Sequence, residues 1–108
     1  MSRICKILPR ADWEAACAAG VFLGSPVDLK DGFIHFSAED QVAETLARHF
    51  AGQADLVLVT VEAEALGPQL KWEPSRGGAL FPHLYGPLPT ALAVSAEPIQ
   101  APPRTSRR

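Results

Sequence analysis

The first part of the chain alternates short apolar runs with residues that end strands and helices. Residues 3–8 form an apolar-rich run that a proline stops, which predicts a first strand. Residues 11–19 contain Ala, Glu and Trp without Gly or Pro, so they predict a helix that the following glycine ends. Its buried stripe is expected at Trp13, Ala16 and Cys17, which lie three and four residues apart.

A turn, a short strand and a second helix are expected next. Residues 21–30 predict an irregular connection, because Gly, Ser and Pro follow one another there. An Asp-Gly pair then turns the chain into a short apolar strand at 33–36. Ser37 followed by acidic residues is typical of a helix start. Apolar positions at helical spacing continue from it, with His49 expected to brace the core, and the helix should close at Gly52.

Strands dominate the pattern of the second half. Residues 55–63 are rich in β-branched residues and predict a central strand covered on both faces, while 70–72 and 91–99 predict two further strands. This order of elements favours an α+β fold with a mostly antiparallel or mixed sheet and two main helices. One domain is expected over residues 1–100, followed by a disordered tail at 101–108.

Composition places the chain among ordinary globular domains. Its 108 residues are 47% hydrophobic and 20% charged, which is enough for one self-sufficient core. The formal net charge of −2 gives no long-range attraction to nucleic acid or anionic membrane. No apolar run approaches the ~20 residues that span a bilayer, and no signal sequence is recognisable. A cytoplasmic protein is expected, with Cys5 and Cys17 reduced.

The segment 71–87 carries the densest set of groups capable of chemistry. It combines Trp, Glu, Arg, His and Tyr with several Gly and Pro residues, a composition typical of a surface loop. Glu73 is interpreted as a catalytic or ribose-binding carboxylate, or else as an exposed ion-pairing residue. Arg76 beside two glycines could clamp a phosphate. His83 and Tyr85 alternate, so an extended backbone would turn both to one face, toward a ligand or toward the core.

A second group of candidates surrounds the short strand at 33–36. His35 places an imidazole near its end, and Ser37 opens the next helix, where unpaired backbone N–H groups could bind an anion. The alternatives are a core histidine and a simple helix cap. The three histidines have no local ligand spacing, so no metal site is expected. A hydrolase built on Ser37 and His35 is disfavoured, because neighbours two residues apart do not align a nucleophile with its base.

Three motifs together resemble the signature of the DUF952 family, which consists of small bacterial domains of unknown function. They are Gly32–Ser37, Trp72-Glu73 and Phe81–Gly86, and the resemblance covers residues 4–99. The family is similar to the ADP-ribosyltransferase fold, a split α+β arrangement around a cleft that binds NAD in the enzymes. The resemblance therefore implies such a fold and such a cleft.

The resemblance also implies roles for individual residues. In the enzymes a polar residue on an early strand anchors the nicotinamide ribose, and Lys6 takes that position here, where many family members have His. His35 falls on the second strand, whose residue flanks the nicotinamide. The enzymes frequently use a late Glu to orient the ribose, but Glu73 and Glu97 are the acidic residues nearby and neither sits in a matching motif.

These observations lead to a hypothesis about function. The expected site is a cleft that binds NAD or a related nucleotide as substrate, with ADP-ribosyl or phosphate transfer as the hypothesised activity. The alternative is a non-catalytic module that binds a small metabolite or a protein partner. The expected catalytic residues are His35, His83 and Glu73. The expected ligand-binding residues are Lys6, Ser37, Trp72, Arg76 and Tyr85.

Overall fold

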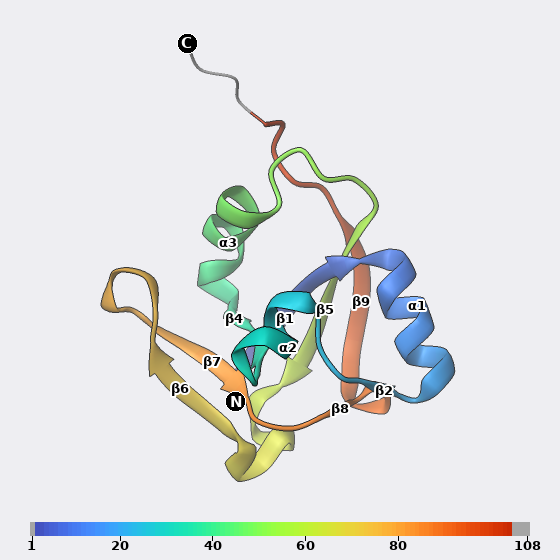
Figure 1. Cartoon of the computed structure of the whole chain (residues 1–108), viewed down its shortest axis with the longest axis vertical. Coiled ribbons are helices and arrows are strands. Elements are labelled where there is room, and N and C mark those ends of the chain that lie inside the picture. The colour runs from blue at the N-terminus through green and yellow to red at the C-terminus, as the bar shows by residue number, and fades with distance from the viewer. Residues whose placement is uncertain (1, 105–108) are drawn as a thin grey trace.

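A four-stranded antiparallel sheet forms the centre of the structure, a computed structural model that describes residues 2–104, with Arg76 described by its backbone alone. Its strands, in spatial order, are β4 (Ser37–Ala38), β1 (Arg3–Pro9), β5 (Leu56–Glu62) and β9 (Ala93–Ile99). Every neighbouring pair in this sheet is antiparallel. Figure 1 shows the three long strands crossing the middle of the molecule.

The central strand of this sheet is β5, as its sequence predicts. It pairs with β1 along its whole length and with β9 on its other edge. Val59 and Val61 are completely buried, and so are Ile4 and Leu8 of β1. β-Branched and other apolar side chains fit this position because a central strand is covered on both faces.

Helix α1 (Arg10–Ala19) follows β1 and packs on the same core. It ends at Gly20, whose φ of 86° lies in the left-handed region that favours glycine. Trp13 and Ala16 are buried, as predicted. Cys17 is exposed, so the prediction that it completes the buried stripe is wrong. The helix lies at one edge of the molecule (Figure 1), and Trp13 and Ala16 are its buried residues.

A second sheet carries the segment that the sequence predicts as a loop. Its strands, in spatial order, are β3 (Ile34–His35), β7 (Leu80–Leu84) and β6 (Leu70–Pro74). Strands β6 and β7 form an antiparallel hairpin, so the loop prediction for residues 71–87 is wrong for most of its length. A two-stranded sheet pairs β2 (Val21–Phe22) with β8 (Leu88–Pro89).

A short helix, α2 (Pro26–Asp31), replaces part of the predicted irregular connection. Ser25 caps its start, and the backbone N–H of Ser25 donates a hydrogen bond to Asp28 Oδ2 at 2.8 Å. The helix ends at Gly32, which has a φ of 87°. The prediction is wrong here because Ser-Pro is compatible with a helix start as well as with a loop. The helix brings Asp28 and Asp31 close to β3.

The third helix starts later than predicted. It consists of η1 (Glu39–Gln41) and α3 (Val42–His49). Ser37 and Ala38 pair with β1 as β4, and the backbone N–H of Ala38 donates to Gln41 Oε1 at 2.8 Å. Ser37 is therefore not the helix cap, because its backbone is engaged in the sheet. His49 is exposed and does not brace the core.

The last described residues lie against the connection between α3 and β5. The backbone N–H of Gly52 donates to the carbonyl of Pro102 at 3.0 Å, and Ala101 packs on an apolar cluster beside α3. Residues 105–108 of the expected disordered tail lie outside the described residues. Turns of 3-10 helix, η2 (Ala63–Gln69), η3 (Arg76–Gly78) and η4 (Thr90–Leu92), connect the remaining strands.

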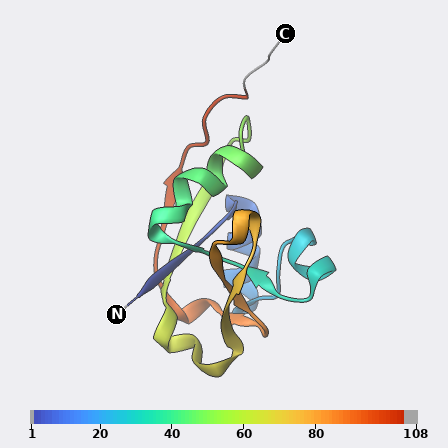
Figure 2. The same cartoon turned by 90° about the vertical axis from the view of Figure 1, so that its left-hand side faces the viewer.

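The architecture is therefore α+β with antiparallel sheets. Within residues 2–104 three α-helices accompany the sheets, one more than the two main helices expected. None of these helices is long and apolar enough to cross a membrane. Seen from the side, α2 lies at the opposite edge of the molecule from β9 (Figure 2).

Candidate functional site

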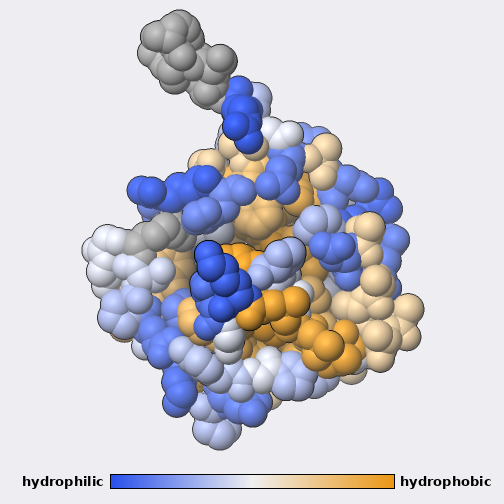
Figure 3. Space-filling model, in the orientation of Figure 1, coloured by the Kyte–Doolittle hydropathy of each residue, from blue (hydrophilic) through white to orange (hydrophobic). Residues whose placement is uncertain are grey.

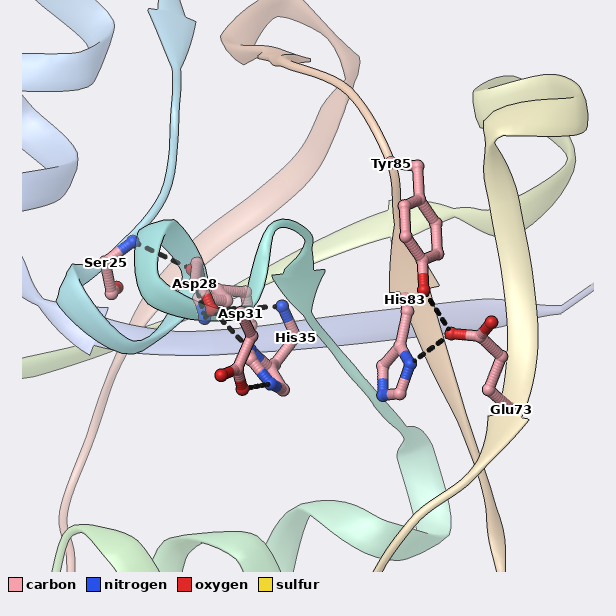
Figure 4. A network of polar contacts seen from close by, with 8 residues as sticks. Ser25, Asp28, Asp31, His35, Glu73, His83 and Tyr85 are labelled. Carbon is pink, nitrogen blue, oxygen red and sulfur yellow. Dashed lines mark hydrogen bonds and ion pairs between the residues drawn. The ribbon is translucent and has the colours of Figure 1, made fainter.

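Two histidines meet at the junction of β3 and β7. His35 and His83 are direct partners in this antiparallel strand pair, so their side chains leave the sheet on the same face. Their ring centroids lie 5.5 Å apart in an edge-to-face arrangement. Figure 4 shows the two rings side by side, with carboxylates bound to each.

Phe33 packs against both imidazoles. Its ring centroid lies 4.1 Å from that of His83 in a stacked arrangement, and 4.6 Å from that of His35. It also lies 5.1 Å from the ring of Tyr85. The phenyl ring therefore fixes the planes of both imidazoles and supplies an apolar neighbour to each.

Glu73 orients His83. It comes from β6, and its Oε1 accepts a hydrogen bond from His83 Nδ1 at 2.7 Å and another from the Tyr85 hydroxyl at 2.8 Å. These two bonds hold the pKa of Glu73 below its usual range, and the bond to Glu73 raises the pKa of Tyr85. An ionised carboxylate can only accept, so Nδ1 of His83 carries the proton. The other nitrogen, Nε2, has no partner among the described residues.

Asp28 and Asp31 of α2 bind the two nitrogens of His35. Nδ1 of the imidazole lies 2.6 Å from Asp28 Oδ1, and Nε2 lies 3.0 Å from Asp31 Oδ2. The backbone N–H of His35 also donates to Asp28 Oδ1 at 3.1 Å. Because both carboxylates are acceptors, a ring that makes both bonds carries both protons and a positive charge.

A buried ion pair lies behind His35. Lys6 Nζ of β1 is 2.9 Å from Asp28 Oδ2, and the two residues are 6% and 1% exposed. Burial opposes ionisation of Asp28, but the bond from His35 and the charge of Lys6 outweigh it and hold its pKa at about 2. Burial lowers the pKa of Lys6, and the Asp28 charge opposes that shift. Asp28 thus stays ionised and fixes the His35 ring.

This arrangement is suited to proton transfer. A carboxylate on Nδ1 fixes the tautomer of a histidine and leaves the lone pair on Nε2, the arrangement of a general base. His83 has this form, held by Glu73. His35 carries its second proton on Nε2 when it binds Asp31, the arrangement of a general acid or a cationic contact.

The structure brings together only part of the predicted site. His35, His83, Glu73 and Tyr85 form one cluster. Lys6 lies beneath it and reaches it through Asp28.

Two predicted ligand-binding residues, Ser37 and Trp72, do not join the cluster. The hydroxyl of Ser37 is buried and hydrogen-bonds Thr45 of α3 at 2.9 Å. Trp72 lies on the opposite face of the hairpin from Glu73, because neighbouring residues of a strand alternate. Arg76 is at the hairpin turn, and its side chain lies outside the described part of the structure.

Sequence reasoning missed four residues of the cluster and its rim. The sequence contains no motif for Asp28 and Asp31, because the Gly, Ser and Pro residues before them predict an irregular connection, and Phe33 has only the pattern of a strand residue. Lys71 pairs directly with His83 across the hairpin, and its charge contributes to the low pKa of Glu73. The four-residue separation of Asp31 and His35 is the one local feature of the sequence that points to their contact.

A small cavity of about 200 Å³ lies next to the site, although neither His35 nor His83 lines it. It is lined mainly by apolar side chains and shares Asp28 and Phe33 with the site. Leu23 and Leu29, at its rim, are 65% and 66% exposed. Figure 3 shows apolar surface in the middle of this face, close to where α2 lies in Figure 1. A larger hollow of about 490 Å³ lies away from the histidine pair, between α3 and residues 102–104.

No cluster of three or more potential metal ligands is present among residues 2–104. Three of the four ring nitrogens of the histidine pair are directed at separate carboxylates rather than at one shared point.

The chain is similar to one described protein family and to solved structures of one protein. A family model described as "Protein of unknown function (DUF952)" matches residues 7–96. The crystal structure of protein CC0527 from Caulobacter crescentus is 57% identical, with a TM-score of 0.89 over 92% of this chain and 87% of that chain. Its solution NMR structure gives 60% identity and a TM-score of 0.80 over 89% and 83%. None of the curated proteins matches the chain.

Proposed function

The chain belongs to the DUF952 family, and we propose that its histidine cluster binds NAD or a related nucleotide and transfers the ADP-ribosyl group by general acid–base catalysis. The cluster is where titratable groups of the second sheet and of α2 converge. The choice of ligand class rests on the likeness of the DUF952 motifs to the ADP-ribosyltransferase fold.

One observation carries the proposal. His83 Nδ1 binds Glu73 at 2.7 Å while its Nε2 has no partner among the described residues, and the His35 ring lies 5.5 Å away. An oriented imidazole with an available nitrogen, next to a second imidazole held by a different carboxylate, is a pair with distinct acid and base roles. A buried histidine needs a hydrogen-bond partner in any role, so the support comes from the pairing of two imidazoles held by different carboxylates rather than from the Glu73 bond alone.

His83 would act on the nucleophile in this reaction. The bond between the ribose C1′ and the nicotinamide nitrogen breaks, and its electron pair leaves with nicotinamide. The acceptor, a hydroxyl group or water, then forms a bond to C1′. His83 Nε2 takes the proton that the acceptor loses, and Glu73 stabilises the resulting imidazolium.

The carboxylates around the cluster suit this charge change. The ribosyl group becomes cationic as nicotinamide leaves, and fixed negative charge stabilises such a transition state. Glu73 and Asp31 flank the two rings and are partly exposed, at 35% and 39% of their side chains. Tyr85, bonded to Glu73, provides an exposed ring at the same place.

The test combines binding with turnover. An amide NMR titration with NAD, ADP-ribose and nicotinamide should shift residues 32–37 and 71–86 saturably, and nicotinamide release should be measurable by chromatography. His83→Asn should retain binding and lose turnover by a factor of about 10²–10⁴. The matched control is His49→Asn, which changes an exposed histidine on α3. Equal turnover in both variants, or no saturable shift at millimolar nucleotide, would sink the proposal.

A second candidate function is binding of a protein partner without catalysis. Trp72 and Leu80 are 42% and 51% exposed, although both are large and apolar. They lie on the hairpin face opposite to the histidine cluster. Exposed apolar groups of this kind are common at interfaces. If this function is correct, Trp72→Ala abolishes capture of a specific partner while nucleotides have no effect on it.

A further inference from the structure

The cavity of about 200 Å³ belongs to the face of the β3–β7 strand pair that does not carry the histidines. Ile34 of β3 and Leu84 of β7 are direct partners, and both line the cavity. Since side chains alternate along a strand, these two leave the sheet on the face opposite to His35 and His83. The cavity is therefore a feature separate from the histidine pair.

The walls of this cavity are almost entirely apolar. Of its eight lining residues, five have large apolar side chains, two are glycines and one is Asp28. The backbone groups of Ile34 and Leu84 lie in the paired strands, and the N–H of Gly32 donates to the carbonyl of Asp28 at 2.8 Å. Water gains few hydrogen bonds at such walls, so an apolar group that displaces it gains binding free energy.

The one charged side chain of the lining has no bonding capacity left for a ligand. Asp28 Oδ1 accepts from Lys6 Nζ and from both the ring and the backbone N–H of His35. Its Oδ2 accepts from the backbone N–H of Ser25 and lies 2.9 Å from Lys6 Nζ. Two carboxylate oxygens offer about four lone-pair positions, and these contacts use them. A molecule in the cavity therefore gains no hydrogen bond from Asp28, and an anionic molecule is repelled by it.

The mouth of the cavity is apolar as well. Leu23 and Leu29 stand at its rim with 65% and 66% of their surface exposed, so an apolar group bound between them would remove part of that surface from water. Gly32 forms another part of the wall. Its φ of 87° favours glycine, and a Cβ there would meet nothing within 4 Å, so no side chain fills the cavity from this side.

The volume of the cavity sets the size of its ligand. An apolar cavity of ~150 Å³ lined by Leu, Ile and Phe is large enough to bind benzene. We propose that the cavity beside α2 is a binding site for a small, uncharged, apolar molecule the size of one substituted six-membered ring, which enters between Leu23 and Leu29. This inference goes beyond the proposed function, because it involves neither a nucleotide nor a proton transfer.

Toluene is the probe, because it is one uncharged ring with one methyl group. It is titrated into the full chain with ¹³C-labelled Leu and Ile methyl groups, and intermolecular NOEs locate the bound ring. The methyl signals of Leu29, Ile34 and Leu84 should shift saturably at millimolar toluene and show NOEs to it. Benzoate has the same ring and should bind at least about tenfold more weakly, because its charge is desolvated at apolar walls and repelled by Asp28.

Leu29→Ala is the variant that tests the site. It removes apolar atoms from the rim and should raise the Kd for toluene about four- to fifteenfold, the effect of losing one or two buried methylene-sized contacts. Leu80→Ala is the matched control, since Leu80 is 51% exposed and does not line the cavity. It should change the Kd by less than about twofold. Both positions are exposed, so both variants should fold, which circular dichroism checks.

Several results would overturn the site. They are the lack of a saturable shift, NOEs from toluene only to residues outside the cavity such as Trp72, and equal effects of Leu29→Ala and Leu80→Ala. Equal affinity for benzoate and toluene would overturn the uncharged class of ligand. None of these readouts uses a nucleotide, so failure of this site is distinguishable from failure of the transferase proposal.

Discussion

Replacement of Asp28 by Asn is the most severe single change that the structure predicts outside the apolar core. The carboxylate is 1% exposed and receives bonds from Lys6, from the ring and backbone of His35, and from the backbone of Ser25. Asn keeps the shape but loses the charge. It also offers one acceptor oxygen instead of two, so its amide NH₂ must face a donor.

The expected loss of stability follows from the Lys6 charge that the substitution leaves buried. Lys6 stays buried, at 6% exposure, without its anion, and removal of one partner of a buried ion pair costs about 3–5 kcal/mol. Domains of this size have a free energy of unfolding of about 5–15 kcal/mol, so the substitution removes a large part of it. At about 4 °C for each kcal/mol, the Tm should fall by about 12–20 °C.

Urea and thermal unfolding followed by circular dichroism would measure this cost. A double-mutant cycle with Lys6→Met isolates the pair, because the double variant no longer buries an unpaired charge. We expect a coupling energy of at least about 2 kcal/mol, with the double variant more stable than Asp28→Asn alone. Asp12→Asn, exposed on α1, should change stability by less than about 0.5 kcal/mol. Additive single effects, or an Asp28→Asn cost near that of Asp12→Asn, would refute the reasoning.

Three further predictions concern the pH dependence of stability, a glycine position and the two cysteines. The pKa of Asp28 falls from 3.8 to about 2 on folding. About 2 kcal/mol of the free energy of unfolding should therefore be present above pH 4 and be lost as the pH falls toward 2. Urea midpoints measured over this pH range would test it. Gly24 has a φ of 131°, and a Cβ at this position would lie 2.9 Å from Asp28 Cβ. At the control position Gly67 a Cβ would meet nothing within 4 Å. Gly24→Ala should therefore lower the Tm more than Gly67→Ala. A maleimide should label the exposed Cys17 in the folded chain and reach Cys5 only after unfolding, because burial shields Cys5 and raises its pKa. Mass spectrometry would show one adduct on the folded chain and two on the unfolded chain.

Elements with strong local patterns were predictable from the sequence. The apolar runs of β1 and β5 and the uninterrupted α1 each form where their own residues favour them. The β6–β7 hairpin is not predicted by the sequence, because the Gly and Pro residues of segment 71–87 are typical of a loop and Pro82 lacks the N–H that a sheet uses. In the structure the Pro82 carbonyl accepts from the Phe36 N–H, so its missing N–H lies on the side where β3 has already ended. That compensation depends on a strand far away in the sequence.

The candidate site was predictable in its residue types and not in its connections. His35, His83, Glu73 and Tyr85 could be selected because titratable and aromatic groups in short motifs are unusual. Their grouping depends on the register between β3 and β7, which long-range pairing sets. The position of Lys71 opposite His83 depends on the hairpin register in the same way.

The two histidines differ in how closely they are tied to the stability of the fold. His35 is fixed by Asp28, and that carboxylate is also the partner of buried Lys6, so a change that disturbs His35 orientation disturbs the core. His83 is fixed by Glu73, a half-buried residue on the edge strand of a hairpin, and loss of this contact leaves no buried charge behind. Because His83 is itself buried, loss of the Glu73 contact leaves its Nδ1–H without an acceptor at a cost of about 1–3 kcal/mol, which is less than the cost of about 3–5 kcal/mol expected at the His35 end.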